Sequence, residues 1–171
     1  DEALQKLLAG VEGEPVTQPL PLKFRTGHRK AFWDKNCVAI GLAGGFIEPL
    51  ESTSIHLTQM GIQRLVNLWP GRGCNRSEIA QYNALMTADY ERLRDFIVLH
   101  YNATEREDTE FWRYVKHMAI PDSLAAKLEI FRSSGRVIPS PEDLFTPHSW
   151  LAVMLGQGIY PQNYDVLVDR V

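Results

Sequence analysis

The sequence has only two cysteines, Cys37 and Cys74, and they form no CxxC pair. Two cysteines are too few for a disulfide scaffold, so we expect both to be buried or half-buried free thiols. The five histidines include no HExxH pair and have no nearby cysteine partner, which leaves no argument for a structural zinc site. We therefore expect a protein without a bound metal.

Long apolar runs and an excess of basic charge are also lacking. The apolar stretch 37–42 falls far short of the roughly 20 residues that cross a bilayer, and no signal peptide opens the chain. Lysine and arginine number 18 against 21 aspartates and glutamates, which gives a net charge of −3. This balance offers no broad attraction for nucleic acids or anionic membranes. We expect a soluble, cytoplasmic protein that binds neither.

What remains is the composition of an ordinary folded domain. The 171 residues are 44% hydrophobic, enough for one core but not for a complete multidomain enzyme. The first residue is Asp1 rather than methionine, and a helical pattern is already under way at Glu2. We expect the chain to be a piece of a longer protein.

Helical periodicity dominates the C-terminal two-thirds of the chain. Apolar residues recur every three or four positions over 55–69 and 77–101. Three shorter helices are predicted from the N-cap candidates Thr109, Asp122 or Ser123, and Thr146. The residues of helix 55–69 that we expect to face the core are Ile55, Ile62, Leu65, Val66 and Trp69.

Two strands are predicted in the first third of the chain, after a short helix and a connector rich in glycine and proline. Residues 23–26 alternate as an edge strand, and 37–42 is a β-branched apolar run typical of a strand buried on both faces. Because two strands do not make a stable sheet, we infer that a preceding region supplies the rest. The predicted fold class is mainly α, with two or so strands that complete the sheet of a missing N-terminal α/β region.

The most informative segment is a glycine loop that leads into a helix, residues 41–57, GLAGGFIEPLESTSIHL. Its three glycines let a flat group approach the backbone closely, and Pro49 stiffens the turn. The free N–H groups around Thr53 and Ser54 would form a site for a small anion at the helix N-terminus. The alternative is that Ser52 or Thr53 only caps the helix.

Two carboxylates, Glu48 and Glu51, lie in the same turn. A carboxylate here can simply favour the positive end of the helix dipole. A carboxylate in a partly apolar site can instead act as a general base toward a reacting carbon or oxygen. Spacing alone leaves both interpretations open.

Residues 36–57, NCVAIGLAGGFIEPLESTSIHL, resemble the signature of flavin-dependent halogenases of the tryptophan halogenase family. Further matches are RLRDFIVLHY at 92–101, FWRY at 111–114, IPDSL at 120–124 and WLAVMLGQG at 150–158. The resemblance is collinear from about residue 20 to 160, so it is more specific than a short motif.

The resemblance implies the C-terminal part of a flavin monooxygenase-like enzyme. Such an enzyme uses FADH2, oxygen and a halide ion, chloride or bromide, to halogenate an aromatic substrate such as indole or tryptophan. A separate flavin reductase would supply the reduced FAD, and the enzyme would form a homodimer. The missing N-terminal region would hold most of the FAD-binding fold, so the fragment alone is expected to be inactive.

The resemblance also assigns roles to residues of this chain. Glu51 matches the catalytic carboxylate beside the substrate ring. The halide site is matched by Thr53 and Ser54, and contacts to FAD are matched by Leu42 and Ile55. A further pair, Phe145 and Trp150, borders the segment that contacts the substrate.

The chain departs from the family pattern in several places. Ser54 stands where known tryptophan chlorinases have glycine, which leaves the preference for chloride or bromide open. Residues 141–150 lack the tyrosine-rich pattern that grips free tryptophan, and the GxGxxG fingerprint and the relay lysine are absent from the sequence. We therefore expect residues 1–50 to end the FAD-binding region with its glycine loop, and residues 51–171 to form the helical substrate-side region.

Two other functions stay open on the sequence alone. A flavin monooxygenase on the same scaffold would oxygenate its substrate without using halide. A helical interaction module derived from a halogenase would have lost catalysis and FAD binding.

Overall fold

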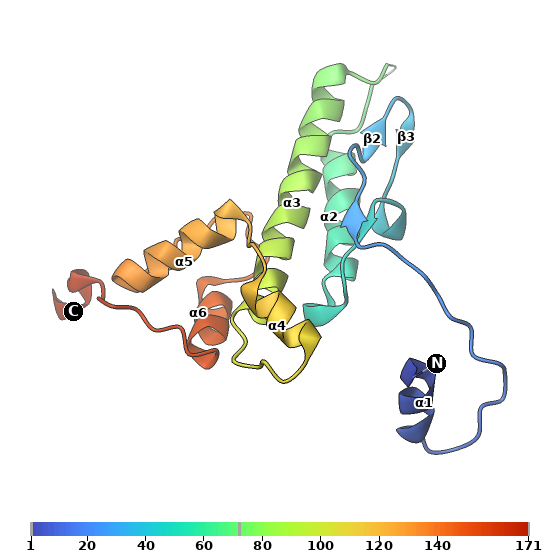
Figure 1. The fold of residues 1–171 in the computed structure, drawn as a ribbon. Helices are drawn as coiled ribbons and strands as arrows, with labels where there is room; N and C mark the ends of the chain where they lie inside the picture. The colour runs from blue at the N-terminus through green and yellow to red at the C-terminus, as the bar shows by residue number, and fades with distance from the viewer. Residues whose placement is uncertain (1, 72, 171) are drawn as a thin grey trace.

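The structure is a computed structural model that describes residues 2–71 and 73–170. Helices make up most of it (Figure 1). They are α1 Glu2–Ala9, α2 Ser54–Asn67, α3 Arg76–Asn102, α4 Glu110–His117, α5 Asp122–Ser134 and α6 Pro147–Gly156, with 3₁₀ turns at Gly41–Ala43, Leu50–Ser52 and Val166–Arg170. The mainly helical prediction is confirmed.

The strands differ from the prediction. The four strands of the described residues are two residues long and form two separate antiparallel pairs. β1 Gly27–His28 pairs with β4 Gly45–Phe46, and β2 Trp33–Asp34 pairs with β3 Cys37–Val38. The strand predicted at 23–26 is wrong, because pairing with β4 begins only at Gly27.

The strand predicted at 37–42, buried on both faces, is also wrong. Only Cys37 and Val38 pair, and the chain then turns into the 3₁₀ turn Gly41–Ala43 because Gly41 takes the left-handed conformation, at φ 63°. An apolar run as short as 37–42 does not by itself distinguish a buried strand from a bent segment.

Both Cys37 and Cys74 are exposed, which corrects the expectation of buried thiols.

The long helix α3 is the centre of the structure, with α2 and the β2–β3 hairpin beside it (Figure 1). The first core lies between these elements and consists of Phe32, Trp33, Leu57, Tyr82, Met86, Tyr90, Leu93 and Ile97. The Asn83 amide oxygen accepts from the backbone N–H groups of Phe32 and Trp33 at 2.7 and 2.8 Å, and its amide nitrogen donates to the Trp33 carbonyl at 2.9 Å. Asn83 thereby fastens the hairpin to α3.

The second core lies where α5 and α6 meet the C-terminal half of α3. It consists of Phe96, Leu99, Leu124, Leu128, Phe131, Trp150 and Met154. The predicted caps hold at Thr109 and Thr146, whose side chains accept from the backbone N–H groups of Trp112 and Ser149. α5 differs, since Pro121 occupies its N-cap position and Asp122 is already helical.

α2 buries a different face from the one predicted. Its buried residues are Leu57, Gly61 and Arg64. Of the residues predicted to face the core, Leu65 is half-buried against the first core, whereas Ile55, Ile62, Val66 and Trp69 are exposed. Gly61 explains the choice, because its carbonyl accepts a hydrogen bond from the Tyr82 hydroxyl at 3.1 Å, so α3 packs directly against it. The more apolar face of α2 is therefore left open.

The first helix lies apart from the others at the end of the extended connector (Figure 1), and none of its residues is buried. The connector adopts no regular structure, as its glycines and prolines predict. Within residues 2–71 and 73–170, every helix is too short or too polar to cross a membrane.

Candidate functional site

The turn between the glycine loop and α2 has an unusual backbone. Glu51 lies at φ 66° and ψ 7°, and Ser52 at φ 54°, so two consecutive non-glycine residues are left-handed. Each such residue costs about 1–3 kcal/mol and persists only where its surroundings hold it. Strained backbone of this kind clusters at functional sites, and the two adjacent left-handed residues make this turn a candidate.

The Glu51 carboxylate faces the C-terminal half of α3. Its Oε1 lies 3.4 Å from Nε2 of His100, whose Nδ1 lies 2.8 Å from the carbonyl oxygen of Phe96. The His100 side chain is 18% exposed and that of Glu51 is 42% exposed. One side of the carboxylate is thus held by the protein, and the other remains accessible.

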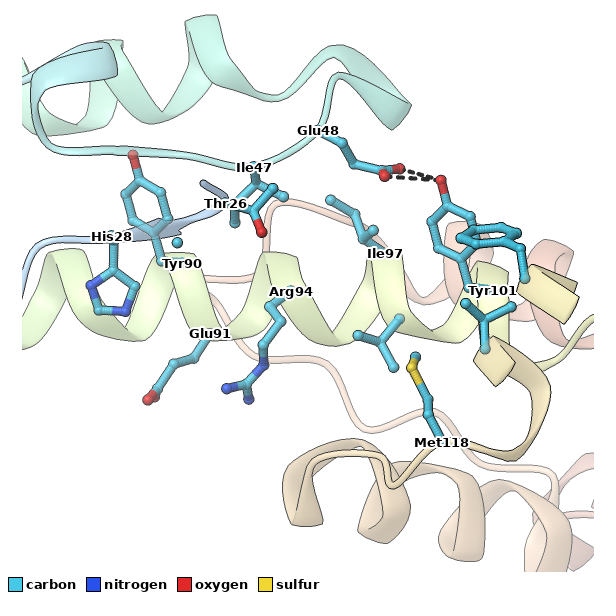
Figure 2. Close-up of a pocket in the computed structure, with 14 residues that line it drawn as sticks. Thr26, His28, Ile47, Glu48, Tyr90, Glu91, Arg94, Ile97, Tyr101 and Met118 are labelled. Atoms are coloured by element: carbon cyan, nitrogen blue, oxygen red, sulfur yellow. Dashed lines mark hydrogen bonds between the residues drawn. The ribbon is translucent and has the colours of Figure 1, made fainter. Parts of the chain in front are cut away.

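Glu48 has a different partner, the next residue along α3. The Tyr101 hydroxyl donates to the Glu48 carboxylate, with oxygen–oxygen distances of 2.7 and 2.9 Å (Figure 2). This hydrogen bond, reinforced by burial, raises the pKa of Tyr101 to about 12. Glu48 therefore anchors the turn to α3.

A cavity of about 450 Å³ adjoins this anchor and is lined by β1, α3 and α4 (Figure 2). Ile47, Tyr90, Ile97 and Met118 give it a largely apolar wall.

Thr53 occupies the N-cap position of α2 but makes no side-chain capping bond. Its hydroxyl is buried and has no hydrogen-bond partner among the described residues. The interpretation of Thr53 as a simple cap is therefore wrong. A buried hydroxyl left unpaired costs about 1–3 kcal/mol, and this one lies at the positive end of a helix, where it is available to a ligand.

A second cavity, of about 250 Å³, brings together Leu42, Ser54 and Ile55 between the glycine loop and the start of α2. Leu42 is 74% exposed and Ile55 is 72% exposed, so two apolar side chains flank an open surface. The glycine loop adds no side chains at Gly41 and Gly45, which also line the cavity. An open apolar surface of this kind could accommodate one side of a flat ring such as that of FAD.

The structure does not bring Phe145 and Trp150 to that cavity. Trp150 is buried in the second core, where Phe96 lies 4.9 Å from its ring and Lys127 Nζ lies 4.4 Å from it. Phe145 stacks on Phe96 at 3.9 Å. Both residues line a void of about 30 Å³, a volume that suits a water molecule and is too small for an indole ring. Their contact with substrate stays a prediction.

The family model for tryptophan halogenase matches residues 1–171. The chain belongs to the tryptophan halogenase family. The tryptophan 6-halogenase SttH from Streptomyces toxytricini is 36% identical to this halogenase chain over 143 residues, which are 80% of the chain and 27% of SttH.

Two solved structures of flavin-dependent halogenases have the same fold as this family member. Xcc4156 from Xanthomonas campestris is 46% identical, and BrvH from Brevundimonas sp. BAL3 is 43% identical. Each superposes with a TM-score of 0.90 and covers 99% of this chain, which in turn spans 34% of each structure. The halogenase chain therefore spans about a third or less of these relatives.

The sequence of this tryptophan halogenase family member does not predict that His100 and Tyr101 of α3 contact Glu51 and Glu48 of the turn. His100 and Tyr101 lie within the matched segment 92–101, but Tyr101 was assigned only to the apolar face of its helix. The signal in the sequence for these two residues is that an imidazole and a phenol stand next to each other at the end of a long amphipathic helix. Nothing local to that helix pointed to the glutamates about 50 residues away.

Proposed function

We propose that this chain is the C-terminal part of a flavin-dependent halogenase that uses FADH2, oxygen and a halide ion on an aromatic, indole- or tryptophan-like substrate. The observation that carries the proposal is the strained turn at Glu51 and Ser52, which leads into a buried, unpartnered Thr53 hydroxyl. Membership of the tryptophan halogenase family supports the substrate class, as do relatives named tryptophan 6-halogenase and flavin-dependent halogenase.

Thr53 and Ser54 are the halide site of this proposal. The Thr53 hydroxyl would donate to the ion, and the first-turn N–H groups of α2, which lack partners within the helix, would donate beside it. The positive end of the helix dipole favours the negative charge. The Ser54 side chain narrows the site and contributes to the choice between chloride and bromide.

Glu51 is the proposed catalytic carboxylate. Replacing an aromatic C–H bond by a carbon–halogen bond releases a proton, and the accessible side of Glu51 is suited to accept it or to hydrogen-bond the hypohalous acid. When bound, the reduced cofactor FADH2 would supply two electrons to O2. In the overall reaction, FADH2, O2, HX and ArH become FAD, ArX and water. Leu42 and Ile55 would hold one edge of the flavin ring.

The rest of the FAD site is assigned to an N-terminal region outside this chain. The exposure of Leu42 and Ile55, which line one cavity, supports a further contact surface there. Residues 1–50 would end the FAD-binding region, and 51–171 would form the substrate-side region. This boundary follows function rather than packing, because Phe32 and Trp33 share a core with α2 and α3.

We further propose a cytoplasmic enzyme, a homodimer, with a separate flavin reductase as its source of FADH2. The test is an assay of the full-length protein with FAD, a flavin reductase, bromide and either indole or tryptophan. We expect a product with the isotope doublet of bromine in its mass spectrum. An oxygenated product without bromine would make the protein a monooxygenase, and failure to bind FAD would make it an interaction module.

A further inference from the structure

The two ring nitrogens of His100 both have defined neighbours. Nδ1 lies 2.8 Å from the Phe96 carbonyl oxygen, and Nε2 lies 3.4 Å from Oε1 of Glu51. A carbonyl oxygen only accepts hydrogen bonds, so Nδ1 carries a hydrogen. In a neutral ring Nε2 is then an acceptor, and it attracts the Glu51 oxygen only if a proton lies between them.

The His100 ring is held firmly enough to orient a partner. Its Nδ1 bond ties it to its own helix, and the Phe96 ring packs edge-on against it with a centroid distance of 4.8 Å. Glu51, in contrast, comes from a turn whose backbone is strained and whose side chain is more exposed. The orientation of the His100 imidazole is therefore set by its own helix. The Glu51 carboxylate is less restrained, and a contact with His100 would orient it.

We propose that His100 is a positioning residue for Glu51, which it orients toward the substrate through the contact between Nε2 and Oε1. The inference rests on the proposed function. Held in this orientation, an ionised Glu51 can accept the proton that leaves the substituted ring carbon. The pair then returns one proton to water, and the step consumes no oxidant or reductant.

The other charged and titratable groups near His100 are few in the described part of the chain. His100 lines an open cavity with Glu105, Arg106 and Tyr160. Arg106 is already paired with Asp108 at 2.8 Å and lies over the Trp112 ring. Glu105 is the carboxylate in that cavity that provides a matched control.

The experiment compares His100→Phe, His100→Gln and Glu105→Gln in the full-length protein, with kcat, KM, FAD binding and the pH profile of kcat as readouts. Phenylalanine keeps a ring but removes both nitrogens, and we expect kcat to fall on the order of 10- to 100-fold with FAD binding and KM unchanged. Glutamine places an N–H near the position of Nε2, so it should recover a large part of kcat. Glu105→Gln should match the unaltered protein.

Two results would overturn the inference. One is a His100→Phe protein with the kcat and pH profile of the unaltered protein. The other is a His100→Gln protein no more active than His100→Phe, since an N–H near the position of Nε2 would then not be what orients Glu51. If the unaltered protein produces no halogenated product at all, the proposed function itself fails, and this result is distinct from both.

Discussion

Tyr101 donates its hydroxyl hydrogen to the carboxylate of Glu48, with oxygen–oxygen distances of 2.7 and 2.9 Å. The preceding residue of α3, His100, faces Glu51 of the same turn. Consecutive residues of one helix thus contact the two glutamates, but in different ways. Glu48 is engaged through both of its oxygens, whereas Glu51 keeps an accessible side, so the structure separates an anchor from a candidate catalytic group.

The hydrogen bond between Tyr101 and Glu48 predicts how the free energy of unfolding depends on pH. The pKa of Tyr101 rises from 10.0 to about 12, first because its hydroxyl donates to Glu48 and second because of burial. The folded state therefore holds the phenol proton more tightly than the unfolded state. The stabilisation is fully present below pH 10 and is lost as the pH rises through 12.

Tyr101→Phe should accordingly lower the free energy of unfolding of the full-length protein by about 1 kcal/mol near neutral pH. The difference from the unaltered protein should shrink between pH 10 and 12, measured by urea unfolding at a series of pH values. A difference that stays constant over this range would show that Tyr101 contributes by packing alone.

The two glutamates should differ in their effect on catalysis. Glu51→Gln should lower kcat on the order of 100-fold or more while FAD remains bound, because the amide cannot accept a proton. Glu48→Gln keeps an acceptor for the Tyr101 hydroxyl and should retain most of the activity. Product formation by mass spectrometry and FAD binding by fluorescence measure both effects. Undiminished halogenation by Glu51→Gln would remove this residue from the mechanism.

The helices were predictable because their signals are local. In α3, Tyr82, Met86, Tyr90 and Leu93 recur at helical spacing and are all buried. The N-caps Thr109 and Thr146 also depend only on residues within one turn.

The buried face of α2 was not predictable, because periodicity favours the more apolar side. The structure buries the other side, where Gly61 lets α3 approach and Arg64 is paired with Asp89. This choice depends on the partner helix and on an ion pair between residues 25 apart. Ile55 and Val66, which lie on the more apolar side, stay exposed.

The candidate site was predictable in its residue types but not in its contacts. The turn with Glu51 and Thr53 was evident from the motif, whereas the unpaired Thr53 hydroxyl depends on how the turn enters α2. The contact between Glu51 and His100 joins residues 49 positions apart, 100 − 51 = 49, and depends on how the turn packs on α3. Local sequence patterns do not contain that information.

The buried ion pair between α2 and α3 should be sensitive to the loss of one partner. The side chains of Arg64 and Asp89 are 9% and 10% exposed, and Arg92 also donates to Asp89 at 2.8 Å. Asp89→Asn leaves the Arg64 charge buried without a counter-charge, so we expect a loss of about 3 kcal/mol in the free energy of unfolding. Asp108→Asn breaks an exposed pair with Arg106 and should leave the unfolding midpoint unchanged. Equal midpoints for both variants would contradict the assignment.

The unpaired hydroxyl of Thr53 gives the sharpest test of the halide site. Thr53→Val keeps the branched shape and removes the hydroxyl, so a residue that serves only packing should become neutral or slightly more stable after the change. If the hydroxyl donates to a halide, the same variant should instead need about 10- to 150-fold more bromide for half-maximal rate, the loss of one hydrogen bond to a charged group.

The matched control for Thr53→Val is Thr58→Val, one turn further along α2. The Thr58 hydroxyl already donates to the Ser54 carbonyl at 2.8 Å, so its removal should leave the bromide dependence as it was. Thermal unfolding of both variants separates stability from binding. A Thr53→Val protein that is as stable as the unaltered one but needs more bromide places the ion at this hydroxyl. An unchanged bromide dependence would mean that the Thr53 hydroxyl is left unpaired only because of the strained turn, and that the halide binds elsewhere.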